Sequence, residues 1–195
     1  LRTVTSAVWD LARGQQMDIS NENNVRTVAL EEYVETIRLK TGALFSASAV
    51  GGALIGGAND LVIEAIRKYA TFLGVAFQIF DDVLGIVGDP KKTGKSAGND
   101  IRRGKCTAIT CHAIKSIKDE KERETFYSIF GKADGSEEEI SVVRSVFEKY
   151  GSIEYAVKLA KEYAGRAISE LNFLDPSREK DIMVDFAKYA VSRGV

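Results

Sequence analysis

Apolar residues recur at helical spacing along almost the whole chain, and this periodicity limits the fold more than any other feature of the sequence. Residues three and four positions apart share one face of an α-helix. No stretch alternates between apolar and polar residues as a half-buried strand would. The only two prolines, Pro90 and Pro176, lie outside the periodic segments. The sequence therefore predicts an all-α fold, a single bundle of roughly eight or nine helices without an internal repeat.

Two helix starts carry capping signals. Ser136 and Glu139 have the spacing of a capping box, in which each side chain bonds the other residue's backbone N–H. Asp175 followed by Pro176 predicts a second start, with Asp as the cap and Pro at the first helical position.

The composition excludes several classes of protein. The 195 residues suffice for one domain, and a net charge of −1 gives no reason to expect nucleic acid or an anionic membrane as partner. Cys106 and Cys111 match no metal-binding or disulfide spacing, so we expect thiols in a reducing compartment. The chain starts without the pattern of a signal peptide, which agrees with a cytoplasmic location.

Residues 41–58 carry no charge and approach the length that spans a bilayer. Most of them are Gly, Ala, Ser and Thr, and the large apolar side chains are Leu44, Phe45, Val50, Leu54 and Ile55. Small residues favour close packing between helices, so we expect a buried central helix and no membrane span.

An acidic pair, Asp81 and Asp82, follows the apolar face of a long helix predicted from about residue 60. Gln78 lies three and four positions earlier, so the three side chains project near one face. Carboxylates are unfavourable at a helix C-terminus. The pair therefore needs a cation or basic partners, unless the helix continues through it or simply ends there at the surface.

A basic, glycine-rich segment follows at once. Its cations are Lys91, Lys92, Lys95, Arg102, Arg103 and Lys105. Lysines beside carboxylates suit a diphosphate bridged by Mg²⁺, which uses one or two carboxylates together with substrate phosphates. Lys40, at the boundary of the uncharged segment, would be desolvated unless it is paired, and is a candidate third element of the same site.

Several motifs in this order resemble those of trans-polyprenyl diphosphate synthases, most closely the archaeal geranylgeranyl and farnesyl diphosphate synthases. They are Gly14-Gln15-Gln16-Met17-Asp18, Lys40-Thr41-Gly42, Phe77-Gln78 with Asp81-Asp82, Thr93-Gly94-Lys95, Asp100, and Gly104-Lys105-Cys106-Thr107. The resemblance implies an isoprenoid-synthase helical bundle, a homodimer, and a Mg²⁺-dependent transferase that condenses isopentenyl diphosphate head-to-tail with an allylic diphosphate.

The resemblance also implies roles for individual residues. Asp81 would be a direct Mg²⁺ ligand, and Asp82 a water-mediated or outer one. Lys40, Lys95 and Lys105 would neutralise the leaving diphosphate. Thr41 and Gln78 would place oxygen dipoles near the allylic cation, and Asp18 would support metal-bound water or Lys40.

Two departures from the family pattern matter. Gly85 stands where the second acidic motif usually ends in Asp, which predicts weaker metal binding. No Asp-Asp pair occurs before residue 81, so the first acidic motif is not in this chain. We therefore expect residues 1–195 to be one helical domain, the C-terminal part of a synthase, and to be inactive alone. Product length stays open, because side chains near the first motif set it.

Three other interpretations remain. The chain could be a non-catalytic or regulatory subunit on the same scaffold. It could be a terpene cyclase or squalene-type synthase, although the Asn, Ser or Thr, Glu triad of those enzymes is not found at a comparable position. It could also be a helical interaction protein whose charges form only a surface lattice, and exposed pairs of that kind contribute little.

Overall fold

The computed structural model describes residues 1–87 and 98–193, and all regular structure within these ranges is helical, which confirms the all-α prediction. The α-helices are α1 (Arg2–Asn23), α2 (Leu30–Ile37), α3 (Ala43–Ile55), α4 (Asp60–Val87), α6 (Asn99–Arg102), α7 (Ala108–Ser116), α8 (Glu120–Ile129), α9 (Glu137–Lys149), α10 (Ser152–Glu170) and α11 (Arg178–Ala190). A π-helical turn, Arg38–Gly42, joins α2 to α3, and a 3₁₀ turn, Leu171–Phe173, ends α10.

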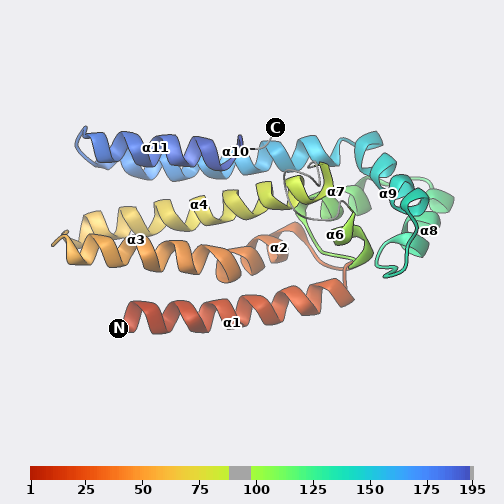
Figure 1. Ribbon diagram of the computed structural model, residues 1–195, viewed down its shortest axis with the longest axis horizontal. Coiled ribbons are helices and arrows are strands. Elements are labelled where there is room, and N and C mark those ends of the chain that lie inside the picture. The colour runs from red at the N-terminus through yellow and green to blue at the C-terminus, as the bar shows by residue number, and fades with distance from the viewer. Residues whose placement is uncertain (88–97, 194–195) are drawn as a thin grey trace.

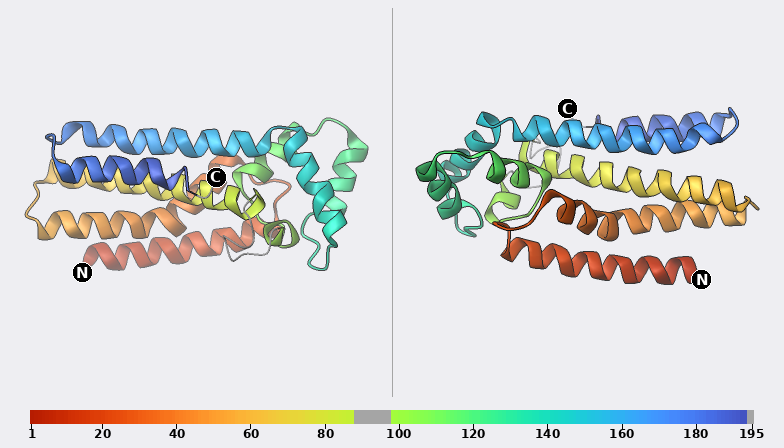
Figure 2. Two further views of the ribbon diagram at one scale, coloured as in Figure 1. Left: turned by 45° about the horizontal axis from the view of Figure 1, so that its top comes forward. Right: turned by 180° about the vertical axis from the view of Figure 1, so that it is seen from behind.

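The long helices lie side by side and alternate in direction, in the order α1, α3, α4 and then the pair α10 and α11 (Figure 1). The short helices α6 to α9 gather at one end, beside the C-terminal half of α4 and the start of α10 (Figure 2). The end of α4 that carries the acidic pair therefore faces the short helices.

Helix α4 is the centre of this arrangement and packs between α3 and α10. Its buried side chains include Leu73, Ile79 and Phe80. Helix α10 approaches it with a stripe of buried alanines at helical spacing, Ala156, Ala160, Ala164 and Ala167. Both helices contribute to the two hydrophobic clusters of the core.

The acidic pair does not end its helix. Helix α4 extends beyond Asp82 as far as Val87, so the two carboxylates lie within the helix rather than at its C-terminus. Of the alternatives left open by the sequence, the structure excludes a helix that ends at the acidic pair.

Helix α3 is not the buried central helix that its small residues predict. Its one buried residue is Val50, and Ile55 is 90% exposed within the part of the chain that the structure describes. The large apolar side chains that fill the core come instead from α4, since a run of Gly, Ala and Ser offers little side chain to bury.

Among the described residues, one helix, α4, is long and apolar enough to cross a membrane, with a mean hydropathy of 1.6 over its most apolar window. That window is 56% buried inside the protein, and core helices meet the same criterion. The packing of α4 between α3 and α10 agrees with a core helix.

One of the two predicted caps is confirmed. Ser136 and Glu139 form the capping box at the start of α9. Helix α11 begins instead at Arg178, with Ser177 Oγ accepting from the backbone N–H of Lys180, so the predicted start at Asp175 and Pro176 is wrong. Ser177, directly after Pro176, is a second residue that can cap a helix. The structure uses Ser177 rather than Asp175 as the N-cap.

Two close backbone approaches hold the π-helical turn that carries Lys40 and Thr41. A Cβ on Gly14 of α1 would lie 2.4 Å from the backbone N of Lys40. A Cβ on Gly74 of α4 would lie 2.7 Å from the Cα of Gly42. The turn is therefore clamped between α1 and α4, at a distance that only glycine permits.

We predict that Gly14→Ala destabilises the protein by about 1–3 kcal/mol, because the added methyl group meets backbone atoms that cannot rotate away. Gly165→Ala is the matched control, since Gly165 lies within α10 with open space around its Cα. The control should be neutral or stabilising by up to about 1 kcal/mol. Urea unfolding of both variants measures the difference, and equal stability of Gly14→Ala and the unaltered chain would refute the clamp.

Candidate functional site

The carboxylate of Asp82 is the centre of a buried polar network. Its residue is only 2% exposed. Tyr33 Oη donates to Oδ2 at 2.7 Å, while Lys105 Nζ and Gln78 Nε2 donate to Oδ1 at 2.7 and 3.1 Å. The three donors come from α2, from α4 and from the segment after α6. A buried carboxylate is tolerable only when it is paired and hydrogen-bonded in this way.

Burial and charge act against each other in this network. Burial raises the pKa of Asp82, and the contacts with Lys105 and Tyr33 offset part of the effect. Burial alone would lower the pKa of Lys105, but the carboxylates of Asp82 and Asp100 raise it overall. Burial and the Asp82 charge hold the pKa of Tyr33 well above its usual value. Lys105 and Tyr33 therefore keep their protons and remain donors.

Asp81 differs from its neighbour in exposure and in partner. Its side chain is 32% exposed, and Oδ1 lies 3.6 Å from Nη2 of Arg193. The Arg193 guanidinium lies 3.6 Å from the ring centroid of Phe77 and donates to the Phe77 carbonyl at 3.4 Å. The two adjacent aspartates thus have separate roles: Asp82 anchors the interior, and Asp81 presents a carboxylate toward solvent.

The motifs that contain Asp18 and Lys40-Thr41, far from the acidic pair in sequence, lie at the same end of α4. Lys40 Nζ donates to Asp18 Oδ2 at 2.6 Å, an ion pair between the π-helical turn and α1. Thr41 Oγ1 donates to Gln78 Oε1 at 2.8 Å. Because Gln78 also donates to Asp82, a continuous chain of hydrogen bonds runs from Thr41 to the buried carboxylate.

The carboxylate of Asp100 lies where the family's usual Asp side chain at position 85 would be. A Cβ on Gly85 would lie 2.7 Å from Oδ2 of Asp100, so the Asp100 carboxylate occupies the space that a side chain at position 85 would need. The same oxygen lies 3.8 Å from Lys105 Nζ. Asp100 therefore supplies a carboxylate beside the acidic pair, which the sequence did not indicate.

The basic segment does not gather as one group. Arg102 bonds Glu137 at 2.6 Å, and Arg103 bonds Glu22 at 2.9 Å, so both point away from the acidic pair. The predicted diphosphate ligand Lys95 lies outside the described residues. Of the predicted site residues that are described, Asp18, Lys40, Thr41, Gln78, Asp81, Asp82 and Lys105 all belong to this region of the fold.

Sequence reasoning missed Tyr33 and Arg193 as members of the site, and it gave Asp100 only as part of a motif. Tyr33 follows the helical spacing of apolar residues and so gives no sign of a site, although a buried tyrosine hydroxyl requires a partner. Asp100 was noted for its motif and not for the space at Gly85. Arg193 lies near the end of the chain, far from every motif, and no signal in the sequence links it to Asp81.

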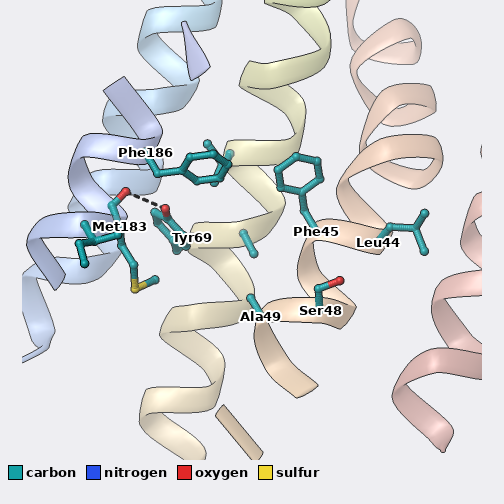
Figure 3. Close-up of a pocket in the computed structure, with 10 residues that line it drawn as sticks. Leu44, Phe45, Ser48, Ala49, Tyr69, Met183 and Phe186 are labelled. Carbon is teal, nitrogen blue, oxygen red and sulfur yellow. Dashed lines mark hydrogen bonds between the residues drawn. The ribbon is translucent and has the colours of Figure 1, made fainter. Parts of the chain in front are cut away.

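An apolar pocket of about 520 Å³ opens one helical turn from Thr41. Phe45 of α3 and Phe186 of α11 flank it on opposite sides of α4 (Figure 3). Tyr69 closes its floor, with Oη donating to the Met183 carbonyl at 2.7 Å. Phe45 also contacts Phe77, with ring centroids 5.4 Å apart, so a lining residue of the pocket touches the residue that precedes Gln78.

Comparison with known proteins gives one consistent result. The polyprenyl synthetase family model matches residues 1–148. A short chain isoprenyl diphosphate synthase of Methanocaldococcus jannaschii is 39% identical over 193 residues, which are 99% of this chain and 57% of that protein.

Crystal structures of similar chains share the fold. A geranylgeranyl pyrophosphate synthetase from Pyrococcus horikoshii is 40% identical with a TM-score of 0.89, over 99% of this chain and 58% of that one. A geranylgeranyl pyrophosphate synthase from Corynebacterium glutamicum, complexed with isoprenyl diphosphate and magnesium, is 27% identical with a TM-score of 0.91, over 98% and 54%. The chain thus spans a little over half the length of these relatives.

We predict that Tyr33→Phe lowers the free energy of unfolding by about 1–2 kcal/mol, because the buried Asp82 carboxylate loses one of its donors. Tyr189→Phe is the control, since Tyr189 is 61% exposed. Urea unfolding at neutral pH compares the two variants. If Tyr33→Phe were as stable as Tyr189→Phe, the hydroxyl would contribute nothing to holding the carboxylate.

Proposed function

The chain belongs to the polyprenyl synthetase family, and from this we propose that it forms the diphosphate-binding wall of a Mg²⁺-dependent prenyltransferase. The reaction joins isopentenyl diphosphate head-to-tail to an allylic diphosphate and gives a short-chain product such as geranylgeranyl or farnesyl diphosphate. The observation that carries the proposal is the convergence of Lys40, Gln78, Asp81 and Lys105 from three separate segments on one end of α4.

Lys40 and Lys105 suit the leaving group. In the proposed reaction the C–O bond of the allylic diphosphate breaks, and negative charge collects on the released diphosphate. Lys40 and Lys105 have side chains 32% and 18% exposed, and each ammonium is oriented by one aspartate at 2.6–2.7 Å. Each ammonium has three N–H donors, so oriented donors remain for phosphate oxygens. Charges fixed before the bond breaks stabilise the separation of charge. We assign Lys95 the same role.

Thr41 and Gln78 suit the cationic fragment. The Thr41 hydroxyl donates its hydrogen bond to Gln78 Oε1, so the lone pairs of Thr41 Oγ1 remain available as acceptors. Asp82 fixes the orientation of the Gln78 amide through Nε2. These oxygen dipoles would stabilise the allylic cation until the double bond of isopentenyl diphosphate forms the new C–C bond. The product cation then loses a proton, and the released diphosphate is the proposed base that accepts it.

The residues fit a role in holding Mg²⁺ as one part of a larger set. Asp81 offers a half-buried carboxylate beside Arg193, and both oxygens of Asp82 accept from protein donors, which favours an outer role for Asp82. The described residues contain no group of three or more His, Cys, Asp or Glu side chains that could hold a metal by themselves. Mg²⁺ binds through one or two carboxylates and substrate phosphates, and it would neutralise the diphosphate as it departs.

The apolar pocket between α3, α4 and α11 would receive the prenyl tail. Its lining is almost entirely apolar, and its lining residue Phe45 contacts Phe77, the neighbour of Gln78. A hydrocarbon tail loses contact with water there at a gain of roughly 0.8 kcal/mol per buried CH₂.

The synthase activity is tested with labelled isopentenyl diphosphate, each allylic primer and Mg²⁺, followed by sizing of the products. We predict incorporation by the full-length protein and none by residues 1–195 alone, because the described residues form one wall of the site. Absence of incorporation with every primer by the full-length protein would overturn the catalytic assignment.

Asp81→Ala separates the proposed site from a surface charge lattice. We predict that it lowers the full-length enzyme's turnover by about a hundredfold, as loss of a group that acts on transition-state charge does. Asp185→Ala is the control, because the Asp185 side chain is 76% exposed and pairs with Lys188 of the same helix. Unchanged Mg²⁺-dependent diphosphate binding and turnover in Asp81→Ala would favour the interaction-protein interpretation.

We also propose a cytoplasmic homodimer. Both cysteines are free thiols, as in a reducing compartment. Helix α1 packs on α3 with one face and exposes Val4, Val8 and Trp9, which are 59%, 56% and 69% exposed. A second copy could cover this apolar face.

Sedimentation velocity tests the dimer. We predict that Trp9→Glu converts it to a monomer, since a charge on the apolar face of α1 would be buried unpaired. Val142→Glu, on α9, is the control for adding a charge at an exposed apolar position. A monomeric unaltered chain, or a dimer that survives Trp9→Glu, would contradict the proposed interface.

A further inference from the structure

The two cysteines, which match no disulfide spacing in the sequence, are in contact. The Sγ atoms of Cys106 and Cys111 lie 3.6 Å apart, and both residues are free thiols. A disulfide needs a sulfur separation of about 2.05 Å, so an approach of about 1.5 Å closes the bond. Cys106 precedes α7 and lies outside any helix, which leaves its backbone free of the helical geometry that Cys111 must keep.

The start of α7 holds the two side chains toward each other. Thr107 is the N-cap, and its Oγ1 accepts from the backbone N–H of Thr110 at 3.2 Å. The Thr110 hydroxyl donates to the Lys105 carbonyl at 3.1 Å. These bonds fold the segment from Lys105 back over the first turn of α7, which brings Cys106 beside Cys111.

Only one of the two thiols can be reached from outside. Cys106 is 2% exposed, whereas Cys111 is half-buried. Cys111 lines a groove of about 650 Å³ between the segment before α2, helix α7 and helix α10. Lys115 and Arg26 lie in the same groove and offer positive charge to an anionic reagent, and Glu31 adds one negative charge to the lining. A small disulfide can therefore meet Cys111 first.

The contact also distinguishes the two thiols chemically. Donation from Cys106 lowers the pKa of Cys111, although burial opposes the effect. The same contact, together with burial, raises the pKa of Cys106. The accessible sulfur is therefore the one that more readily forms the thiolate, which is the nucleophile in thiol–disulfide exchange.

We propose that Cys106 and Cys111 form a reversible intramolecular disulfide by exchange with a small-molecule disulfide such as oxidised glutathione. The Cys111 thiolate attacks one sulfur of glutathione disulfide, forms a mixed disulfide and expels one glutathione thiolate. Cys106 then gives its proton to the released glutathione thiolate and attacks Sγ of Cys111, which expels the second glutathione as a thiolate. Two protein thiols are oxidised and one glutathione disulfide is reduced to two thiols. Since Lys105 precedes Cys106, the disulfide would form beside the Asp82 network.

The experiment incubates the folded chain with oxidised glutathione, quenches with acid and measures the intact mass without reductant. The expected product is lighter by two hydrogen atoms, carries no glutathione and returns to the starting mass with dithiothreitol. Cys106→Ser should stop at a glutathione adduct on Cys111, and Cys111→Ser should remain unmodified. An adduct that persists on the unaltered chain, a disulfide between two chains, or no change in mass would each overturn the proposal.

Discussion

The buried carboxylate of Asp82 is the interaction on which the rest of the structure depends. An ionised group that is 2% exposed requires charged and hydrogen-bonding partners, and they must arrive from other segments because its own helix supplies only Gln78. Tyr33 brings α2 against α4, and Lys105 brings the segment between α6 and α7 to the same point. Removing the Lys105 charge would leave the carboxylate without its ionic partner, which costs several kcal/mol, whereas loss of the neutral Tyr33 donor costs less.

Close packing of backbones places the second half of the site. Gly14 and Gly74 let α1 and α4 approach the π-helical turn from either side, and this position puts Lys40 against Asp18 and Thr41 against Gln78. π-helical turns are rare and often occur at functional sites. Here the turn carries two adjacent polar side chains toward neighbouring helices, so the same feature serves packing and the proposed binding of diphosphate.

Much of the fold and of the candidate site could be predicted from local pattern. Helical periodicity gave the fold class, the Ser136 box gave the start of α9, and the motifs named seven residues that the structure brings into one region. The failures share a physical cause. The position of α3, the cap of α11 and the contact between Cys106 and Cys111 depend on which elements meet in space, and spacing along the chain does not report this.

The sequence by itself determined the helices, the family and the identity of the charged groups, because periodicity and motifs are properties of neighbouring residues. Only the tertiary structure decided which of those groups are buried and which partners each one contacts. It buried Asp82 among three donors and left Asp81 beside Arg193, although the two residues are adjacent and chemically identical. It also placed Asp100 against Gly85, which fills a gap that the sequence could only show as a missing carboxylate. Burial and proximity arise from packing between distant segments, and they set the charge, the exposure and the partners of each side chain.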